Sequence, residues 1–336
     1  MSAPTLTAAE GIPDIDISPF ATGDAAAQAS VAADVDLACR EIGFFTIRGH
    51  GIGQPQIDAA LAMADAFFGL PETEKLTIRQ PAPQISRGYT PLAAEQLSAG
   101  LGEAAPPDLK ELIDIGPIEI GTDPYYTGPD AGDHFHANLW PAAPEGFRDM
   151  MEGYYRAMNG LADTLMEIFA VALGQPSGFF ANALDRNISA LRLICYPEQL
   201  TPPVPGQLRG GAHTDYGTLT ILTADQAPGG LQAQRHDGVW IDVVPQPGTF
   251  IVNIGDAMQV WTNDQWISTL HRVVNPPAAL AATARRISMP FFHQPNYDAV
   301  IAPLPGCVPE GAVPHHAPIT FGEHWMRKWA ASRDID

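Results

Sequence analysis

The chain has 336 residues, of which 46% are hydrophobic and 17% are charged, the composition of a globular protein with a large core. Eighteen basic and 38 acidic residues give a net charge of -20. A surface of this charge repels phosphate, which disfavours binding to nucleic acid or to an anionic membrane. The three cysteines are widely and irregularly spaced, so no disulfide framework is predicted, and we see no leader or bilayer-spanning run. We expect a cytoplasmic protein, with no protein partner implied.

The N-terminal region, residues 1–130, predicts two strand and helix pairs and then a long irregular stretch. The predicted elements are a strand over 12–17, a helix from Asp24 to a stop at Gly43, a strand over 44–48 and a helix over 54–69. Residues 80–129 are dense in Pro and Gly and have weak periodicity. A stretch of this length without regular structure often covers a site, so it is a candidate lid, with an ordinary surface excursion as the alternative.

The middle of the chain, residues 131–187, contains the longest helical pattern, in which apolar side chains repeat every three or four residues over 144–173. Residues 188–300 then change to short β-rich runs. These runs are 188–196, 218–223, 231–234, 239–243, 250–254, 266–274 and 286–293. Asp237-Gly238 between two of them is typical of a tight hairpin. Many short strands at near-regular spacing favour an antiparallel sandwich or barrel.

The C-terminal region, residues 301–336, ends in a predicted helix. Thr320-x-x-Glu323 has the pattern of a capping box, and Trp325, Met326 and Trp329 follow at helical spacing. No linker or internal repeat divides the chain. We therefore predict one domain over residues 1–336, mainly β with helices packed around it.

The stretch 210–217 contains a candidate metal site. Side chains two apart on a strand share a face, so His213 and Asp215 converge, although one such pair is expected by chance among ten histidines. His271 lies in a later run that could pass beside His213, and its alternative interpretation is a buried, hydrogen-bonded histidine. His293 is a weaker candidate for the third ligand. Two imidazoles and one carboxylate leave open coordination positions, which suits Fe(II) that must bind a co-substrate and O2.

A second pair, Arg286 and Ser288, shares a strand face in the same way. An Arg fork binds a carboxylate through two hydrogen bonds, and a neighbouring hydroxyl can donate to the same group. The pair therefore predicts a clamp for an organic acid. The alternative is an arginine that an internal Asp or Glu neutralises.

Together with Tyr196-Pro197, these motifs resemble the isopenicillin N synthase-like branch of the Fe(II)- and 2-oxoglutarate-dependent oxygenases. The resemblance covers nearly the whole chain, and its further motifs are Ile12 to Phe20, Gly43-Phe44-Phe45, Gly49-His50-Gly51, Asp108 to Glu111 and Asp114 to Gly116. It implies a double-stranded β-helix, a distorted jelly roll, with flanking helices. One position departs from the family's Asn-x-Tyr pattern, where Ile194 replaces the Asn.

The resemblance implies that His213, Asp215 and His271 bind iron. It also implies that Arg286 and Ser288 hold the distal carboxylate of 2-oxoglutarate, and that Tyr196 lies near the co-substrate and helps to fix it. Candidate residues for the substrate pocket are the aromatics Tyr216 and Phe292, for which core packing is the alternative.

The implied function is an Fe(II)- and 2-oxoglutarate-dependent dioxygenase that hydroxylates or desaturates a small-molecule metabolite, consuming O2 and releasing succinate and CO2. The nearest alternative is an oxidase or cyclase of the same fold that uses Fe(II) and O2 without 2-oxoglutarate. The second alternative is a non-catalytic jelly-roll protein that binds an organic acid, although such a protein has no use for an open metal face. The reaction outcome depends on which substrate carbon is presented, so the motifs do not identify the substrate.

Overall fold

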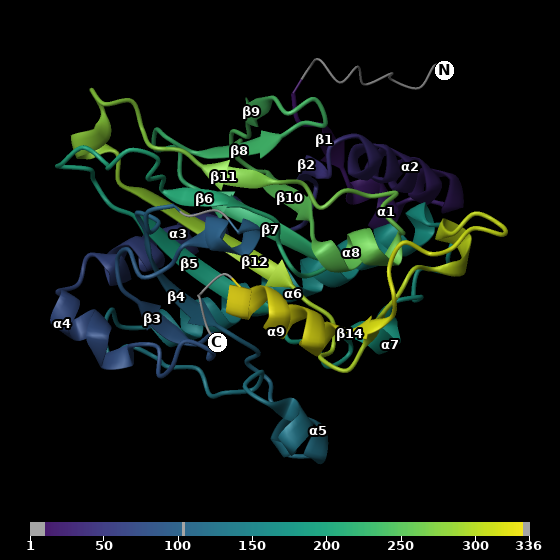
Figure 1. The fold of residues 1–336 in the computed structure, drawn as a ribbon, viewed down its shortest axis with the longest axis horizontal. Coiled ribbons are helices and arrows are strands. Elements are labelled where there is room, and N and C mark those ends of the chain that lie inside the picture. Colours follow the sequence, from purple (N-terminus) through teal and green to yellow (C-terminus); the bar gives the residue numbers. More distant parts are fainter. Residues whose placement is uncertain (1–10, 103–104, 332–336) are drawn as a thin grey trace.

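The computed structural model describes residues 11–102 and 105–331. Its centre is an eight-stranded sheet with the strand order β1-β2-β10-β7-β12-β5-β4-β3, in which β1 and β2 are parallel and all other neighbours are antiparallel (Figure 1). Its strands are β1 (Asp14–Asp16), β2 (Phe44–Arg48), β3 (Gly88–Thr90), β4 (Glu111–Ile115), β5 (Ala190–Tyr196), β7 (Leu219–Ala224), β10 (Phe250–Ile254) and β12 (Arg286–His293).

A smaller antiparallel sheet has the order β6-β11-β8-β9. Its strands are β6 (Gly210–His213), β8 (Leu231–Gln234), β9 (Trp240–Asp242) and β11 (His271–Val273). Apolar side chains of the two sheets pack together in a cluster that contains Phe44, Leu231 and Ile251. Two short strands, β13 (Val300–Ile301) and β14 (Ile319–Thr320), pair near the C-terminus. The two apposed sheets are the predicted double-stranded β-helix, and the fold class is confirmed.

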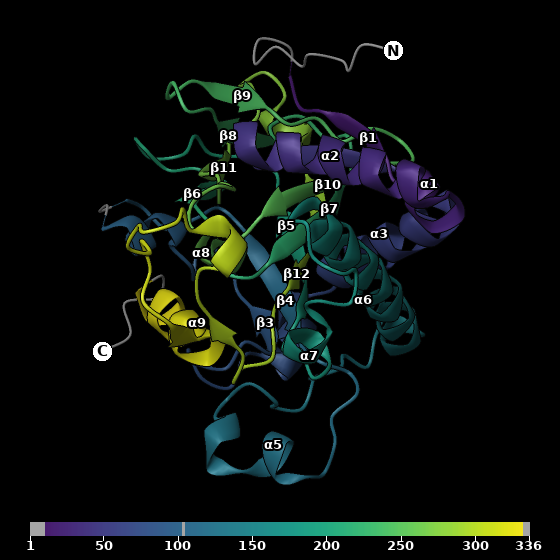
Figure 2. The same cartoon turned by 90° about the vertical axis from the view of Figure 1, so that its right-hand side faces the viewer.

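Helices cover the other face of the large sheet. The α-helices of the described residues, on either side of the sheet, are α1 (Ser18–Thr22), α2 (Ala25–Glu41), α3 (Gln54–Phe68), α4 (Glu72–Lys75), α5 (Pro124–Thr127), α6 (Phe147–Ala172), α7 (Ala181–Leu184), α8 (Asp256–Trp261) and α9 (Phe321–Ala331). In Figure 2, α3 and α6 lie on one side of the sheet, whereas β6, β8 and α9 lie on the other. Buried residues of α2, α3, α6 and the sheet form the main hydrophobic core. None of the helices in the described ranges could cross a membrane.

Local sequence accounts for the bounds of the helices. The Asp24 carboxylate accepts hydrogen bonds from the backbone N–H groups of Ala26 and Ala27, which fixes the start of α2. Gly43 follows the end of α2 with φ of +64°, a conformation that glycine adopts without steric cost. The predicted helix over 54–69 and the strand over 44–48 agree closely with α3 and β2.

The predicted strand over 266–274 is too long, because only its last part is β11. The backbone N–H groups of Trp266 and Ser268 donate instead to side chains of the α8 region, Thr262 and Gln259 respectively. These bonds occupy the donors that a strand neighbour would need, so the regular ladder begins only at His271.

The segment 80–129, predicted to be irregular, supplies two strands of the large sheet, β3 and β4. Every residue of β4 is buried, including Glu111 and Asp114, whose charges obscure the strand pattern in the sequence. Each is neutralised inside the protein, Glu111 by Lys75 at 2.6 Å and Asp114 by Arg192. This segment also contributes residues to the cavity described below.

The C-terminal helix α9 begins as the capping pattern predicts, with the backbone N–H of Glu323 donating to Thr320 Oγ1 at 3.3 Å. Trp325 and Trp329 are buried and their rings stack with centroids 4.8 Å apart. Met326, predicted on the same face, is 39% exposed. Its position, one residue after Trp325, turns it toward solvent.

Candidate active site

His213, Asp215 and His271 meet between the two sheets. In the smaller sheet β6 and β11 pair so that His213 lies directly opposite His271. One ligand atom from each of the three side chains lies within 4.8 Å of the others. Asp215 Oδ1 is 3.8 Å from His213 Nε2 and 3.7 Å from His271 Nε2. The donor set and its spacing therefore fit a divalent metal ion with three protein ligands on one face.

The remaining polar atoms of these side chains are held by the protein. The Nδ1 of His213 lies 2.8 Å from the carbonyl oxygen of Gly211, and that of His271 lies 3.0 Å from the carbonyl oxygen of Thr269. A carbonyl only accepts, so each Nδ1 carries the hydrogen and each Nε2 presents its lone pair to the site. Such partners fix the ring orientation of metal-binding histidines.

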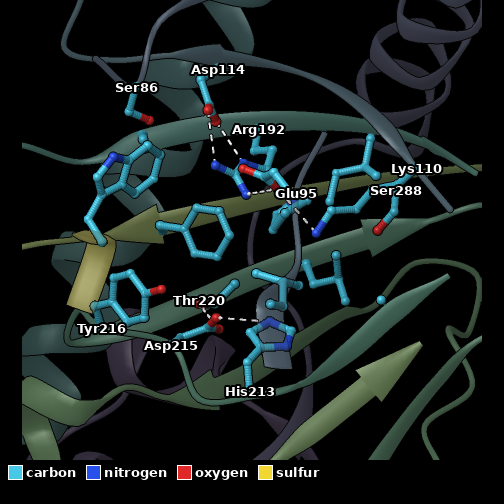
Figure 3. A pocket seen from close by; sticks show the side chains of 18 of the residues that line it. Ser86, Glu95, Lys110, Asp114, Arg192, His213, Asp215, Tyr216, Thr220 and Ser288 are labelled. Atoms are coloured by element: carbon cyan, nitrogen blue, oxygen red, sulfur yellow. Dashed lines mark hydrogen bonds and ion pairs between the residues drawn. The ribbon is translucent and has the colours of Figure 1, made fainter. Parts of the chain in front are cut away.

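Asp215 is supported on its outer side by the large sheet. Thr220 of β7 lies beside Asp215 (Figure 3) and donates to its Oδ2 at 2.5 Å, and Asn253 of β10 donates to the same atom at 2.7 Å. Oδ1 is thereby left to face the two imidazoles. His213 and Asp215 do not lie on one strand as predicted, because β6 ends at His213 and Asp215 lies in the following turn.

The electrostatics of the group suit a metal cation. Burial, reinforced by the neighbouring His271, lowers the pKa of His213 to about 3, so its imidazole is neutral at physiological pH. Burial opposes the ionisation of Asp215, but the adjacent imidazoles and the donors Asn253 and Thr220 outweigh it and lower the pKa of this carboxyl. A neutral imidazole and an ionised carboxylate are the forms that bind metal.

The cavity beside this group is lined by alternate residues of two neighbouring strands. From β5 and its approach these are Ile188, Ala190, Arg192, Ile194 and Tyr196, and from β12 they are Arg286, Ser288, Pro290 and Phe292. Alternate side chains of a strand share a face, so the pairing of β5 with β12 places all of them on one wall. Arg286 and Ser288 thus share a face of β12, as predicted.

Arg286 lies on this wall with only 4% of its surface exposed. Its Nη1 donates to the carbonyl oxygens of Asp225 and Ala227 at 3.1 and 3.0 Å, and lies 3.7 Å from Asp225 Oδ1. Burial lowers the pKa of the guanidinium, although a carboxylate as close as Asp225 favours its charge. Asp225 therefore balances part of this charge from behind, as the alternative interpretation expected, and Arg286 also lines the cavity.

The other predicted residues also line the cavity. Tyr196 is the direct strand neighbour of Arg286, and burial raises the pKa of its hydroxyl, which keeps it protonated as a possible donor. Tyr216 and Phe292 are partly buried and lie along the same space. His293, on the opposite parity of β12, is fully buried, and its Nδ1 lies 2.7 Å from Thr218 Oγ1. His293 does not belong to the metal-binding group of the described residues.

A buried network of charges, which was not predicted from the sequence, faces the metal-binding group across the cavity (Figure 3). Arg192 forms two hydrogen bonds with Asp114, at 2.7 and 2.9 Å, and its Nη1 lies 3.4 Å from Glu95 Oε2. Lys110 lies 3.2 Å from the same Glu95 atom and 3.2 Å from Asp108. Arg192 was detectable in principle, because it lies four residues before Tyr196 and so shares its strand face.

Comparison with known proteins agrees with this geometry. Residues 12–143 match the model of the N-terminal region of the non-haem dioxygenases in morphine synthesis, and residues 187–295 match that of the 2OG-Fe(II) oxygenase superfamily. Among curated proteins, a homoarginine-6-hydroxylase of Oryza sativa subsp. japonica is 35% identical over 95% of this chain and 96% of its own length. The 2-oxoglutarate-Fe(II) type oxidoreductase hxnY of Emericella nidulans is also 35% identical, over 92% of this chain and 86% of its own.

Solved structures give the same result. The crystal structure of full-length Neurospora crassa T7H in complex with alpha-KG and thymine superposes with a TM-score of 0.83 at 31% identity, covering 95% of this chain and 96% of that one. Both family models, the two curated relatives and this structure indicate the same cofactor chemistry. The chain therefore belongs to the 2OG-Fe(II) oxygenase superfamily, in its isopenicillin N synthase-like branch, and is an Fe(II)- and 2-oxoglutarate-dependent dioxygenase.

Proposed function

We propose that His213, Asp215 and His271 are the Fe(II) ligands, and that Arg286, with Ser288 and Tyr196, binds the distal carboxylate of 2-oxoglutarate. The observation that carries the proposal is that the three ligand atoms and this buried guanidinium border one cavity. When bound, iron and 2-oxoglutarate supply the activation of O2 for oxidation of a substrate C–H bond, with succinate and CO2 as co-products.

The residues of the chain hold this chemistry in place. The carbonyls of Gly211 and Thr269 keep the proton on Nδ1 of each histidine, so the Nε2 atoms stay available. Thr220 and Asn253 orient the Asp215 carboxylate. Preorganised groups of this kind do not need to rearrange during the reaction. Arg286 would orient the co-substrate through the bidentate geometry that guanidinium and carboxylate share.

The substrate is a small molecule, and we propose that it lies between the metal face and the charge network of Arg192, Asp114 and Glu95. Tyr216 and Phe292 would form apolar sides of this space and help to exclude water. The names of similar proteins give the first compounds to assay, because relatives are named for homoarginine and a structural neighbour contains thymine. Succinate formation that depends on the added compound would identify the substrate.

The clamp is tested by Arg286→Met. Removing charge-assisted hydrogen bonds to the carboxylate is expected to weaken binding of 2-oxoglutarate about 10- to 100-fold. The measurement is calorimetric titration of 2-oxoglutarate into Co(II)-loaded protein, alongside succinate release with Fe(II).

Arg285→Met is the matched control. The adjacent Arg285 donates to the Asp65 backbone carbonyl and pairs with the Asp65 carboxylate, both at 3.0 Å, and it does not line the cavity. Its substitution should leave the affinity for 2-oxoglutarate unchanged. Equal affinities in the parent protein and in Arg286→Met would refute the assignment of the clamp.

A further inference from the structure

Asp256, the first residue of α8, touches both segments that supply the candidate metal ligands. Its backbone N–H donates to the carbonyl oxygen of Asp215 at 2.8 Å. Its Oδ2 accepts from Thr214 Oγ1 at 3.3 Å, and Thr214 lies between His213 and Asp215 in the chain. Its Oδ1 accepts from Ser268 Oγ at 2.6 Å, three residues before His271. One carboxylate therefore joins the turn after β6 to the segment that leads into β11.

The same carboxylate also holds the C-terminal helix. Lys328 of α9 lies 2.7 Å from Asp256 Oδ2, and its Nζ donates to Thr214 Oγ1 at 3.4 Å. The ammonium group is also 5.8 Å from the centre of the Tyr216 ring. In Figure 2, α9 lies on the same side of the large sheet as β6 and β8 of the smaller sheet. Lys328 is thus one contact between α9 and the turn that carries Asp215, and His324 of the same helix also interacts with the backbone of Tyr216 in this turn.

This contact matters because α9 forms a wall of the cavity. Trp325 and Trp329 both line it. Trp329 donates to the carbonyl oxygen of Pro83 at 2.9 Å, and its ring lies 6.0 Å from the Arg192 guanidinium. A shift of α9 would therefore move this tryptophan wall relative to the charge network.

The Lys328 and Asp256 pair is poorly placed to stabilise the whole fold. The Lys328 side chain is 35% exposed, and half-exposed ion pairs contribute little to global stability because solvent screens them. Asp256 is more protected, at 14% exposed, and it has three other hydrogen-bonding groups around it. A pair of this kind can fix the position of one element relative to another without dominating the stability of either.

We propose that Asp256 is a positioning residue that couples the cavity wall on α9 to the metal-binding turn through Lys328. Binding of metal and co-substrate orders the turn, and the Asp256 contacts transmit this order to α9. By linkage, the position of α9 influences the affinity of the turn for metal. The inference rests on the proposed ligands His213, Asp215 and His271.

The test is backbone hydrogen exchange of peptides within 321–331, with and without Co(II) and 2-oxoglutarate. In the parent protein we expect these ligands to slow exchange of α9 by at least about 5-fold. Lys328→Met keeps the aliphatic stem and removes the charge, and it should reduce this slowing. Lys328→Arg, which keeps the charge, should restore it. Asp256→Asn should also weaken Co(II) binding about 10-fold, as expected for a residue that supports metal ligands.

Arg327→Met is the matched control, since it removes a neighbouring exposed charge from the same helix. In this variant, Co(II) and 2-oxoglutarate should slow hydrogen exchange of α9 as much as in the parent. If Co(II) and 2-oxoglutarate slowed exchange of α9 equally in the parent and in Lys328→Met, the coupling would be overturned. The assignment of His213, Asp215 and His271 as metal ligands would not be affected. Failure of the parent protein to bind Co(II) would instead contradict the proposed ligands, and the coupling with them.

Discussion

His271 and His293 illustrate how far a single residue can be interpreted from sequence. Both lie in β-rich runs and both are buried. They differ in what surrounds Nε2. That of His271 lies 3.7 Å from Asp215 in a group that also contains His213, whereas that of His293 lies 4.0 Å from Asp163 and belongs to no such group of the described residues. The alternation of side chains along a strand excludes His293 from the cavity, because it lies on the face of β12 opposite to Arg286 and Ser288. This alternation can be predicted from the sequence, but the groups that surround the Nε2 atom of each histidine cannot.

The environment of His293 predicts a pH dependence of stability. Burial lowers the pKa of His293 from 6.5 to about 3. Between these values the unfolded chain binds a proton that the folded protein does not, so the free energy of unfolding falls as the pH falls. The slope from one such group is about 1.4 kcal/mol per pH unit. His293→Asn should therefore lose stability less steeply than the parent on acidification.

Chemical denaturation at several pH values between 6.5 and about 4 measures this slope. His236→Asn is the control, because the His236 side chain is exposed, and it should follow the parent. A slope in His293→Asn as steep as that of the parent would show that His293 is not kept neutral by the fold.

At the scale of elements, Gly43 determines how α2 joins β2. It has φ of +64°, and a Cβ there would collide with the backbone carbonyl of Ile267. Gly43→Ala therefore combines backbone strain with a clash and should lower the free energy of unfolding by about 2 to 3 kcal/mol. Thermal or denaturant unfolding measures the change.

Gly174, just after the end of α6, provides the comparison. Its φ is +70°, but a Cβ there would meet no atom within 4 Å. Gly174→Ala should show the strain alone, about 1 kcal/mol. If the two variants lost equal stability, the contact with Ile267 would have no energetic role.

Elements whose pattern is local were predictable, whereas those set by distant partners were not. The apolar repeat of α6 and the alternation around β12 are determined by neighbours in sequence, and both elements lie close to their predicted bounds. β4 was missed because its charges are matched by Lys75 and Arg192, which are far away in the chain. The start of β11 was placed too early because Gln259 of α8 and Thr262 just after it accept hydrogen bonds from the backbone N–H groups that precede β11.

At the scale of the whole molecule, the candidate metal site joins the two sheets. His213 and His271 belong to the smaller sheet, whereas Asp215 is held by Thr220 and Asn253 of the larger one. A metal ion bound to all three ligands would therefore link the sheets at the cavity. Metal binding should stabilise the folded domain as well as supply its chemistry, because the unfolded chain does not preserve this arrangement.

Addition of Co(II) or Mn(II) is accordingly expected to raise the unfolding temperature. At a metal concentration about 100 times Kd, binding adds about 2.7 kcal/mol to the free energy of unfolding, and a chelator should reverse the gain. In a chain of this size the expected rise is a few degrees, measurable by scanning calorimetry. Asp215→Ala removes the ligand that connects the sheets and should show no metal-dependent rise. An equal rise in that variant would place the stabilising metal elsewhere in the protein and contradict the proposed link between the sheets.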